Sequence, residues 1–211
     1  MPPPTRDLEV LAAVESGEIV SQLKLSQRVG IAVGLVNALL RRAIRKGLVK
    51  VKSAPGKRYA YYLTPKGFSE KSRLVVEYLG VSLQFFREAR AQYLELLQAA
   101  RKQGLQRIVI VGGGEFAEIA ALAGSEAEVH FLAVVDAKSE RTRLFGIPVV
   151  RGLGELQDID LAIVADHLAP QQCYDNLVRQ LGAERVMAPG CLRISAHERG
   201  QGDRQRRGEV A

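Results

Sequence analysis

The sequence predicts two domains of different class joined by one long helix. The first is an α+β domain of short helices and a β-hairpin, and the second is an α/β domain built on a parallel sheet. Short helical patterns and then two alternating strands occupy residues 1–65, one uninterrupted helical pattern occupies residues 66–103, and strands alternate with helices over residues 104–195. Residues 196–211 are polar and rich in glycine, so we expect a disordered tail there.

Charge is distributed unevenly along the 211 residues. Residues 1–103 contain 18 Lys and Arg against 8 Asp and Glu, a net charge of +10, whereas residues 104–211 contain 12 against 15, a net charge of −3. A basic half of this kind is typical of proteins that bind a polyanion, and a solvated basic surface is the alternative. The asymmetry therefore favours a polyanionic partner for the first half only.

The composition argues against a membrane, secreted or metal-binding protein. The longest apolar runs have strand length and fall short of the roughly 18 to 20 residues that span a bilayer. Residues 1–7 lack the basic-then-apolar pattern of a signal peptide. Cys173 and Cys191 form no C-x-x-C pair and the histidines are scattered, so we expect free thiols, no metal and a cytoplasmic location.

The first 65 residues carry the start and stop signals of three short helices and a hairpin. The first predicted helix is capped by Thr5 and ended by Ser16-Gly17, and the second covers residues 20–29. After a turn at Gly30, the third helix runs from Ala32 to Lys46 and is closed by Gly47. Two strands follow over residues 48–52 and 58–63, joined by a turn at residues 53–57. A helix, a glycine turn, a basic helix and a basic hairpin in this order form a winged helix-turn-helix.

A winged helix-turn-helix predicts contacts with duplex DNA through its third helix and its hairpin. An α-helix fits the major groove, where Asn bonds adenine and Arg bonds guanine or phosphate, while lysines of the hairpin follow the DNA backbone. For each residue alone a solvated surface position is the alternative, but the ordered set favours DNA binding. The residues expected at this interface are Leu35, Asn37, Ala38, Arg41, Arg42, Arg45, Lys50, Lys52, Lys57 and Arg58.

Residues 5–100 also contain four recognisable motifs, which are Leu25–Ile31, Val36–Leu40, Lys46–Val51 and Tyr62–Gly67. Together they resemble the MarR-type regulators associated with exopolysaccharide gene clusters. The Leu-Thr-Pro-x-Gly step at residues 63–67, from the hairpin to the long helix, is the most specific of them. The resemblance implies a DNA-binding transcription regulator. It departs from the family pattern at Leu35, where a second basic residue is usual.

The long helix over residues 66–102 carries an apolar stripe with spacings of three and four residues. The stripe consists of Val75, Leu79, Ser82, Phe86, Ala89, Tyr93, Leu96 and Ala100, with Ser82 as a polar interruption. At 1.5 Å per residue the helix is about 55 Å long, which is too long to bury its stripe against a small domain alone. We therefore expect a homodimer formed through this helix, with packing against the second domain as the alternative.

The sequence after residue 104 begins with a strand, a glycine turn, a helix and a second strand. The first strand is Arg107–Val111, the turn begins with Gly112-Gly113-Gly114 and runs to Ala117, and the second strand ends at Asp136, 22 residues after Gly114. This is the mononucleotide-binding βαβ unit of a Rossmann-like sheet. Further strands and a helix are expected over residues 161–165, 169–182 and 185–187.

Such a unit predicts a nucleotide site at the glycine turn. Glycines let the backbone approach a pyrophosphate, the helix N-terminus attracts it, and the acid after the second strand bonds a ribose or a base. The residues expected to bind a cofactor are Gly112, Gly113, Gly114, Phe116, Asp136, Asp166 and His167. A nucleotide, a nucleotide sugar and NAD all fit this pattern. Asp166-His167 has no nucleophile motif beside it, so we expect no catalytic residue.

Four pieces of this domain are Ile108–Ala117, Val134–Asp136, Phe145–Val149 and Gly152-Leu153. They resemble the N-terminal Rossmann-like domain of bacterial acetyltransferases that act on nucleotide-linked sugars. The resemblance implies a domain that holds the nucleotide end of such a ligand, without the hexapeptide-repeat domain that transfers the acetyl group. Glu115 departs from the pattern, because an acid at the helix start repels a pyrophosphate or satisfies the free N–H groups itself.

These observations predict a DNA-binding transcription regulator whose C-terminal Rossmann-like domain senses a ligand or a partner, with a link to polysaccharide genes. One alternative is a redox-sensing repressor that responds to NADH and NAD. The other is a Rossmann enzyme that acts on a nucleotide-linked substrate.

Overall fold

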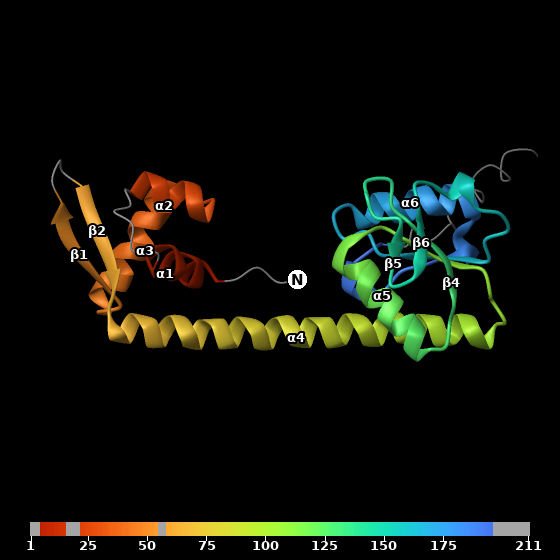
Figure 1. Ribbon diagram of the computed structural model, residues 1–211, viewed down its shortest axis with the longest axis horizontal. Coiled ribbons are helices and arrows are strands. Elements are labelled where there is room, and N and C mark those ends of the chain that lie inside the picture. The colour runs from red at the N-terminus through yellow and green to blue at the C-terminus, as the bar shows by residue number, and fades with distance from the viewer. Residues whose placement is uncertain (1–4, 16–21, 55–57, 196–211) are drawn as a thin grey trace, which may run out of the picture. The chain divides into compact units, whose positions relative to one another are not determined.

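The computed structural model of the chain describes residues 5–15, 22–54 and 58–195 (Figure 1). It separates into two compact units, of which unit 1 ends at Phe85 and unit 2 begins at Phe86. The division falls inside the long helix α4, Pro65–Lys102. The predicted order of a winged helix-turn-helix, a long helix and a Rossmann-like sheet is confirmed. The predicted tail, residues 196–211, lies outside the described residues.

The described part of unit 1 contains three short helices and an antiparallel hairpin before α4. These elements are α1 Arg6–Glu15, α2 Gln22–Val29, α3 Val33–Arg45, β1 Val49–Ala54 and β2 Arg58–Leu63. Thr5 caps α1 as expected, because its hydroxyl accepts a hydrogen bond from the backbone N–H of Leu8 at 3.4 Å. The expected end of α1 at Ser16-Gly17 and the expected start of α2 at residue 20 lie outside the described residues.

Helices α2 and α3 form the helix-turn-helix, and the chain bends by 105° between them. Gly30 in the turn adopts a left-handed conformation with φ +67°, which favours glycine. The backbone N–H of Ile31 then donates to the carbonyl oxygen of Ser26 at 3.1 Å. Leu25 of α2 and Leu40 of α3 are fully buried in the core of unit 1. The turn and this core together fix which side of α3 faces solvent.

The step from the hairpin to α4 is held by Thr64, and Gly67 allows close packing there. The Thr64 hydroxyl is buried, donates to the carbonyl oxygen of Gly47 at 2.7 Å and accepts from the backbone N–H of Gly67 at 3.0 Å. Pro65 follows as the first residue of α4, where its missing N–H costs no helical hydrogen bond. A Cβ atom on Gly67 would collide with the carbonyl group of Leu48. The Leu-Thr-Pro-x-Gly motif at this step is therefore explained by close packing of the chain.

The C-terminal part of α4 belongs to the core of unit 2. Tyr93 is fully buried, and its hydroxyl donates to the carbonyl oxygen of Val164 at 2.8 Å. Burial raises the pKa of the Tyr93 hydroxyl, so it remains a donor at neutral pH. Ala89, Leu97 and Ala100 are also fully buried. The prediction of a dimer seam along the whole helix is therefore wrong for Ala89, Tyr93 and Ala100, because these side chains pack inside their own domain.

Unit 2 is built on a sheet with strand order β5-β6-β4-β3-β7-β8, parallel except for the β5–β6 pair. The strands are β3 Ile108–Val111, β4 Phe131–Val135, β5 Arg143–Leu144, β6 Ile147–Val150, β7 Leu161–Val164 and β8 Val186–Met187, with helices α5 Gly114–Glu126 and α6 Pro170–Leu181 and 3₁₀ turns η1 Leu153–Glu155, η2 Ala183–Arg185 and η3 Gly190–Leu192. The chain winds outward from β3 to β6 and returns as β7 on the other side of β3. Right-handed crossovers therefore put α5 and α6 on opposite faces.

Two features of unit 2 differ from the expectation. Helix α5 begins at Gly114 rather than Glu118, because the chain turns directly from β3 into the helix. Strands β5 and β6 were not predicted, since Pro148 interrupts the strand pattern. Their connecting residues Phe145 and Gly146 have φ values of +47° and +85°, as a two-residue hairpin turn requires.

Neither a single membrane-spanning helix nor a metal-binding cluster is found among the described residues. No single helix there is long and apolar enough to span a membrane, and α2 with α3 reaches the required length and composition only when the bent pair is counted together. Within the same residues, no three His, Cys, Asp or Glu side chains are grouped to hold a metal ion.

Replacing Gly67 by Ala should destabilise unit 1, because the added Cβ atom meets the carbonyl group of Leu48. We expect a decrease of roughly 1–3 kcal/mol in the free energy of unfolding. Gly80→Ala is the matched control, because Gly80 lies in open space on the same helix, and it should stabilise by up to about 1 kcal/mol. Thermal denaturation followed by circular dichroism measures both. A Gly67→Ala variant as stable as the wild type would contradict the close contact.

Candidate nucleic-acid interface and nucleotide crevice

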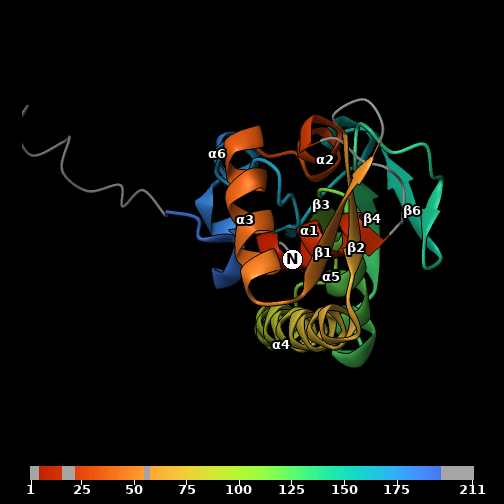
Figure 2. The ribbon, with the colours of Figure 1, turned by 90° about the vertical axis from the view of Figure 1, so that its left-hand side faces the viewer.

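Figure 2 shows α2 and the β1–β2 hairpin on one side of α3, and the buried residues of α3 belong to the core of unit 1. Val36 and Leu40 are fully buried. At 3.6 residues per turn this directs Ala38, Arg41 and Arg45 away from the core, and all three are exposed. Two of the predicted cations and a small residue therefore form the middle of the solvent-facing side of α3.

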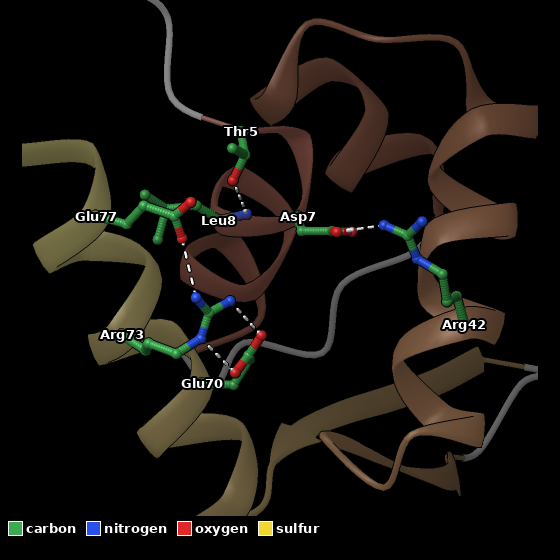
Figure 3. Close-up of polar contacts among 7 residues, drawn as sticks. All are labelled: Thr5, Asp7, Leu8, Arg42, Glu70, Arg73 and Glu77. Carbon is green, nitrogen blue, oxygen red and sulfur yellow. Dashed lines mark hydrogen bonds and ion pairs between the residues drawn. The ribbon is translucent and has the colours of Figure 1, made fainter. Parts of the chain in front are cut away.

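Three other predicted residues of α3 lie at the margins of that side. Leu35 is exposed, and Asn37 is half-buried with its side-chain oxygen accepting from the Gln22 amide at 3.4 Å. Arg42 donates to the carboxylate of Asp7 on α1 (Figure 3). This hydrogen bond and the opposite charge raise the pKa of Arg42. Because α1 already supplies a counter-charge, Arg42 is a weaker candidate for DNA contact than Arg41 and Arg45 on the exposed side.

The β1–β2 hairpin exposes two of the cations predicted for the wing. Lys50 and Lys52 are exposed on β1, and the Lys52 ammonium lies 5.6 Å from the ring centroid of Tyr62 on β2. Lys57 and the side chain of Arg58 lie outside the described residues. Tyr62 was not among the predicted interface residues, although alternating aromatic residues opposite lysines in a hairpin are the signal that would have identified it.

Six of the seven residues predicted for cofactor binding line one crevice of 400 Å³ in unit 2. These six are Gly112, Gly113, Gly114, Asp136, Asp166 and His167. The crevice lies at the carboxyl ends of β3, β4 and β7, where the direction of winding reverses. Gly112 has φ +116°, and a Cβ atom there would collide with the backbone of Asp166. A Cβ atom on Gly113 would meet the carboxylate of Asp136 and displace that side chain, so glycine is required at position 112, whereas a substitution at position 113 would move Asp136.

Phe116 does not line this crevice, which corrects its predicted role. Because α5 begins at Gly114, Phe116 lies in the first helical turn and is buried. Its ring stacks on His167 with the ring centroids 5.5 Å apart and the planes inclined by 13°. Phe116 therefore supports the wall that His167 forms.

Both carboxylates of the crevice accept backbone hydrogen bonds. Asp136 accepts from the N–H of Lys138 at 3.0 Å. Asp166 accepts from the N–H of Leu168 at 2.8 Å and of Ala169 at 3.1 Å, which leads the chain into α6. The Asp166 oxygen that makes these bonds has a structural role, because it satisfies N–H groups just before a helix.

Two cations that line the crevice form no ion pair within residues 58–195. Among residues 58–195, neither the Lys138 ammonium nor the Arg151 guanidinium makes a hydrogen bond or ion pair, and both line the crevice. Arg141 pairs with Glu118 at 3.1 Å, and the Arg143 guanidinium donates to the carbonyl oxygen of Gly146 at 2.8 Å. Arg151 was not predicted from the sequence, and its signal is a basic residue directly after a parallel strand, at the end where ligands bind.

Two further polar groups are Cys173, which lines the crevice, and Glu115, which lies beside it. Glu115 is exposed in the first turn of α5 and lines an adjoining cavity of 310 Å³. Burial, and secondly the carboxylate of Asp166, raise the pKa of the Cys173 thiol to about 11. Cys173 is therefore a neutral thiol at physiological pH.

Comparison with known proteins gives one family match. A family model described as winged helix-turn-helix DNA-binding matches residues 5–50. No curated protein was found to match the chain.

Three solved structures illustrate the partial likenesses of this chain. The PcaV transcriptional regulator from Streptomyces coelicolor is 25% identical over 39% of this chain and 60% of its own, with a TM-score of 0.37. MepR, a transcription regulator of the Staphylococcus aureus multidrug efflux pump MepA, is 17% identical over 38% and 62%, with a TM-score of 0.33. Human N-acetylserotonin methyltransferase is 13% identical over 86% and 75%, with a TM-score of 0.28.

This chain therefore spans less than two thirds of the length of either bacterial regulator. With TM-scores of 0.37 or less, these likenesses identify neither its fold nor its function. The order of the elements identifies the N-terminal unit as a winged helix-turn-helix, and residues 5–50 are similar to the winged helix-turn-helix DNA-binding family.

Proposed function

We propose that this protein is a MarR-type transcription regulator that binds duplex DNA as a homodimer and carries a nucleotide-binding sensor domain. One observation carries the proposal. In a unit that matches winged helix-turn-helix DNA-binding proteins, the solvent-facing side of α3 presents Arg41 and Arg45. The resemblance to regulators of exopolysaccharide genes directs the search for an operator to the promoters of such genes.

The charges of unit 1 support binding to a polyanion. Helix α3 contains three arginines and no acidic residue. Asp7 pairs with Arg42, whereas Arg41 and Arg45 form no ion pair with any described residue and remain to enter a groove or bind phosphates. Lys50 and Lys52 on the hairpin add two exposed cations for the DNA backbone.

The N-terminal part of α4 supports dimerisation. Five exposed apolar side chains recur at spacings of three, four or eight residues along one side of it, and they are Phe68, Val76, Leu79, Leu83 and Phe86. Val76 is 70% exposed and Leu79 51% exposed, which is unusual for a continuous apolar stripe. A 3-4 spacing is the pattern that packs one helix on another. A second copy of α4 would cover this stripe, and two copies would present two recognition helices to two half-sites.

The crevice of unit 2 supports a sensor role. Its glycine turn lets a phosphate approach the backbone, and Lys138 and Arg151, which form no ion pair within residues 58–195, supply positive charge beside it. The Asp136 carboxylate beside Gly113 is an acceptor for ribose or base. An anionic nucleotide is the ligand class that uses all of these groups.

The polar groups of the crevice favour a sensor over an enzyme. Asp166 holds two backbone N–H groups and Cys173 is a neutral thiol, so neither is prepared as a base or a nucleophile. We propose that a bound nucleotide is retained and not converted. Incubation with NAD, NADH and UDP-sugars, followed by chromatography of the nucleotides, tests this, and any turnover would favour the enzyme.

Changing Arg41 and Arg45 together to Ala should weaken binding to duplex DNA at least about tenfold, because two positive charges are removed from α3. The plot of log affinity against log salt should become less steep by about 0.9 for each phosphate that the variant no longer neutralises. Arg73→Ala is the control, because Glu70 and Glu77 hold Arg73 on α4 (Figure 3). Fluorescence anisotropy with promoter DNA measures the affinities. A double variant that binds as tightly as the control would exclude α3 as the recognition helix.

Leu79→Asp should convert the proposed dimer into a monomer, because it puts a charge into the apolar stripe. The side chain is exposed within one chain, so the fold should survive. Val81→Asp is the matched control, since Val81 is 49% exposed on the opposite side of α4. Sedimentation velocity measures the oligomeric state, and circular dichroism verifies the fold. If both variants keep the wild-type mass, the dimer contact lies elsewhere.

Arg151→Ala should weaken the binding of ADP or UDP at least about tenfold, because an unpaired guanidinium is removed from the crevice. Arg143→Ala is the control, because its guanidinium is held by the hairpin carbonyl of Gly146. Isothermal titration calorimetry of both variants gives the affinities, and NAD and NADH are included to test a redox sensor. If the wild type binds none of these nucleotides, the sensor role is wrong.

A further inference from the structure

A second cavity, of 430 Å³, adjoins the nucleotide crevice along helix α6. The two cavities share Arg151, Asp166 and Cys173 and the ends of β3 and β4. The part that belongs to this cavity alone, here called the α6 groove, is lined chiefly by Leu153, Gln172, Asn176, Leu177 and Gln180. None of these residues is needed to hold a nucleotide at the glycine turn.

The α6 groove exists because one crossover of the sheet lacks a full helix. The connection from β6 to β7, residues 151–160, contains only the short turn η1. In a doubly wound sheet a helix at this crossover would cover the face on which α6 lies. The connection is nevertheless well held, because the Glu155 carboxylate accepts from the N–H of Arg151 at 2.8 Å and of Gly152 at 3.1 Å. The groove therefore has an ordered wall opposite α6.

The wall formed by α6 carries a row of amide side chains. Gln172, Asn176 and Gln180 are spaced four residues apart, so they lie on one side of the helix. Within residues 58–195, the side chains of Gln172 and Gln180 have no hydrogen-bond partner. Asn176 accepts from the guanidinium of Arg179 through its side-chain oxygen. The row thus offers amide donors and acceptors toward the cavity.

The chemistry of the α6 groove suits a ring that carries hydroxyl groups. Amides donate to and accept from hydroxyl oxygens, and the apolar side chains of Leu153 and Leu177 suit the C–H face of such a ring. Arg151 lines both cavities, so one guanidinium can bond a phosphate bridge between them. Cys173 at the junction is a neutral thiol and adds no negative charge there.

We propose that the α6 groove binds the second, hydroxyl-bearing half of a ligand whose nucleoside half occupies the nucleotide crevice and whose diphosphate lies at Arg151. The proposal rests on the proposed nucleotide-sensing function and deepens it. Dinucleotides and nucleotide sugars share this chemistry, so the test includes one matched pair of compounds for each.

The test compares compounds that differ only in the second half of the ligand. Isothermal titration calorimetry of the full-length protein should show that ADP-ribose binds more tightly than ADP, or UDP-glucose more tightly than UDP, by at least about tenfold. Each neutral hydrogen bond is worth about fivefold in affinity. A difference between ADP-ribose and ADP would identify a dinucleotide as the ligand, and a difference between UDP-glucose and UDP would identify a nucleotide sugar.

Gln172→Ala combined with Gln180→Ala should abolish this difference and leave the affinity for ADP and UDP unchanged. Gln98→Ala combined with Gln103→Ala is the control, because both glutamines are exposed, Gln98 near the end of α4 and Gln103 directly after it. If the wild type binds ADP-ribose no more tightly than ADP, and UDP-glucose no more tightly than UDP, the proposed role of the α6 groove is wrong while nucleotide binding is retained. Equal weakening of ADP and ADP-ribose in the first variant would overturn this role as well. If none of the four compounds binds, nucleotide sensing itself fails and this proposal fails with it.

Discussion

Helix α4 takes part in two hydrophobic cores, and this constraint determines much of the sequence between Thr64 and Lys102. At its start the helix passes against the backbone of Leu48, which requires glycine at position 67. Toward its end Tyr93 bonds the last carbonyl group of β7. The apolar stripe between these two contacts is used by neither core, so a partner is needed to bury it.

The exposed ion pairs in the middle of α4 stabilise the helix only weakly. Arg73 bonds Glu70 at 2.9 Å and Glu77 at 3.0 Å, but exposed pairs of this spacing contribute only about 0.3–0.5 kcal/mol each. Most helical stability in proteins comes from packing of an apolar face. Burying one exposed leucine or valine contributes about 1.5–3 kcal/mol, several times more than such a pair. Dimerisation is therefore the larger available contribution to the order of this segment.

Local sequence patterns predicted those parts of the fold that depend on neighbouring residues. The step around Thr64 and the glycine turn at Gly112 could be predicted because capping and positive φ values restrict the residue types allowed there. The exposed stripe on α4 could be predicted only in part, because a 3-4 spacing indicates that one side of a helix is apolar but not what covers it. Tyr93 is accordingly a core residue and Val76, not Val75, belongs to the exposed side.

Interactions between distant residues explain most of what could not be predicted from the sequence. Arg42 and Asp7 are 35 residues apart, so nothing in the local pattern of α3 distinguishes Arg42 from Arg41. Arg151 follows β6, a strand that was not predicted because Pro148 interrupts its sequence pattern. Its position beside the glycine turn depends on the strand order of the sheet. Both differences change which cations are available for a ligand, and neither changes the fold class.

The role of Glu115 depends on how the other charges of the crevice are used. Its carboxylate lies in the first turn of α5, where a negative charge stabilises the helix dipole. Asp136 and Asp166 each accept backbone hydrogen bonds, which stabilise carboxylates without needing a cation. Among the described residues, Lys138 and Arg151 therefore form no ion pairs with these two acids. A phosphate at the glycine turn would meet the carboxylates of Glu115, Asp136 and Asp166 as well as these two cations, so binding of an anionic ligand depends on Lys138 and Arg151.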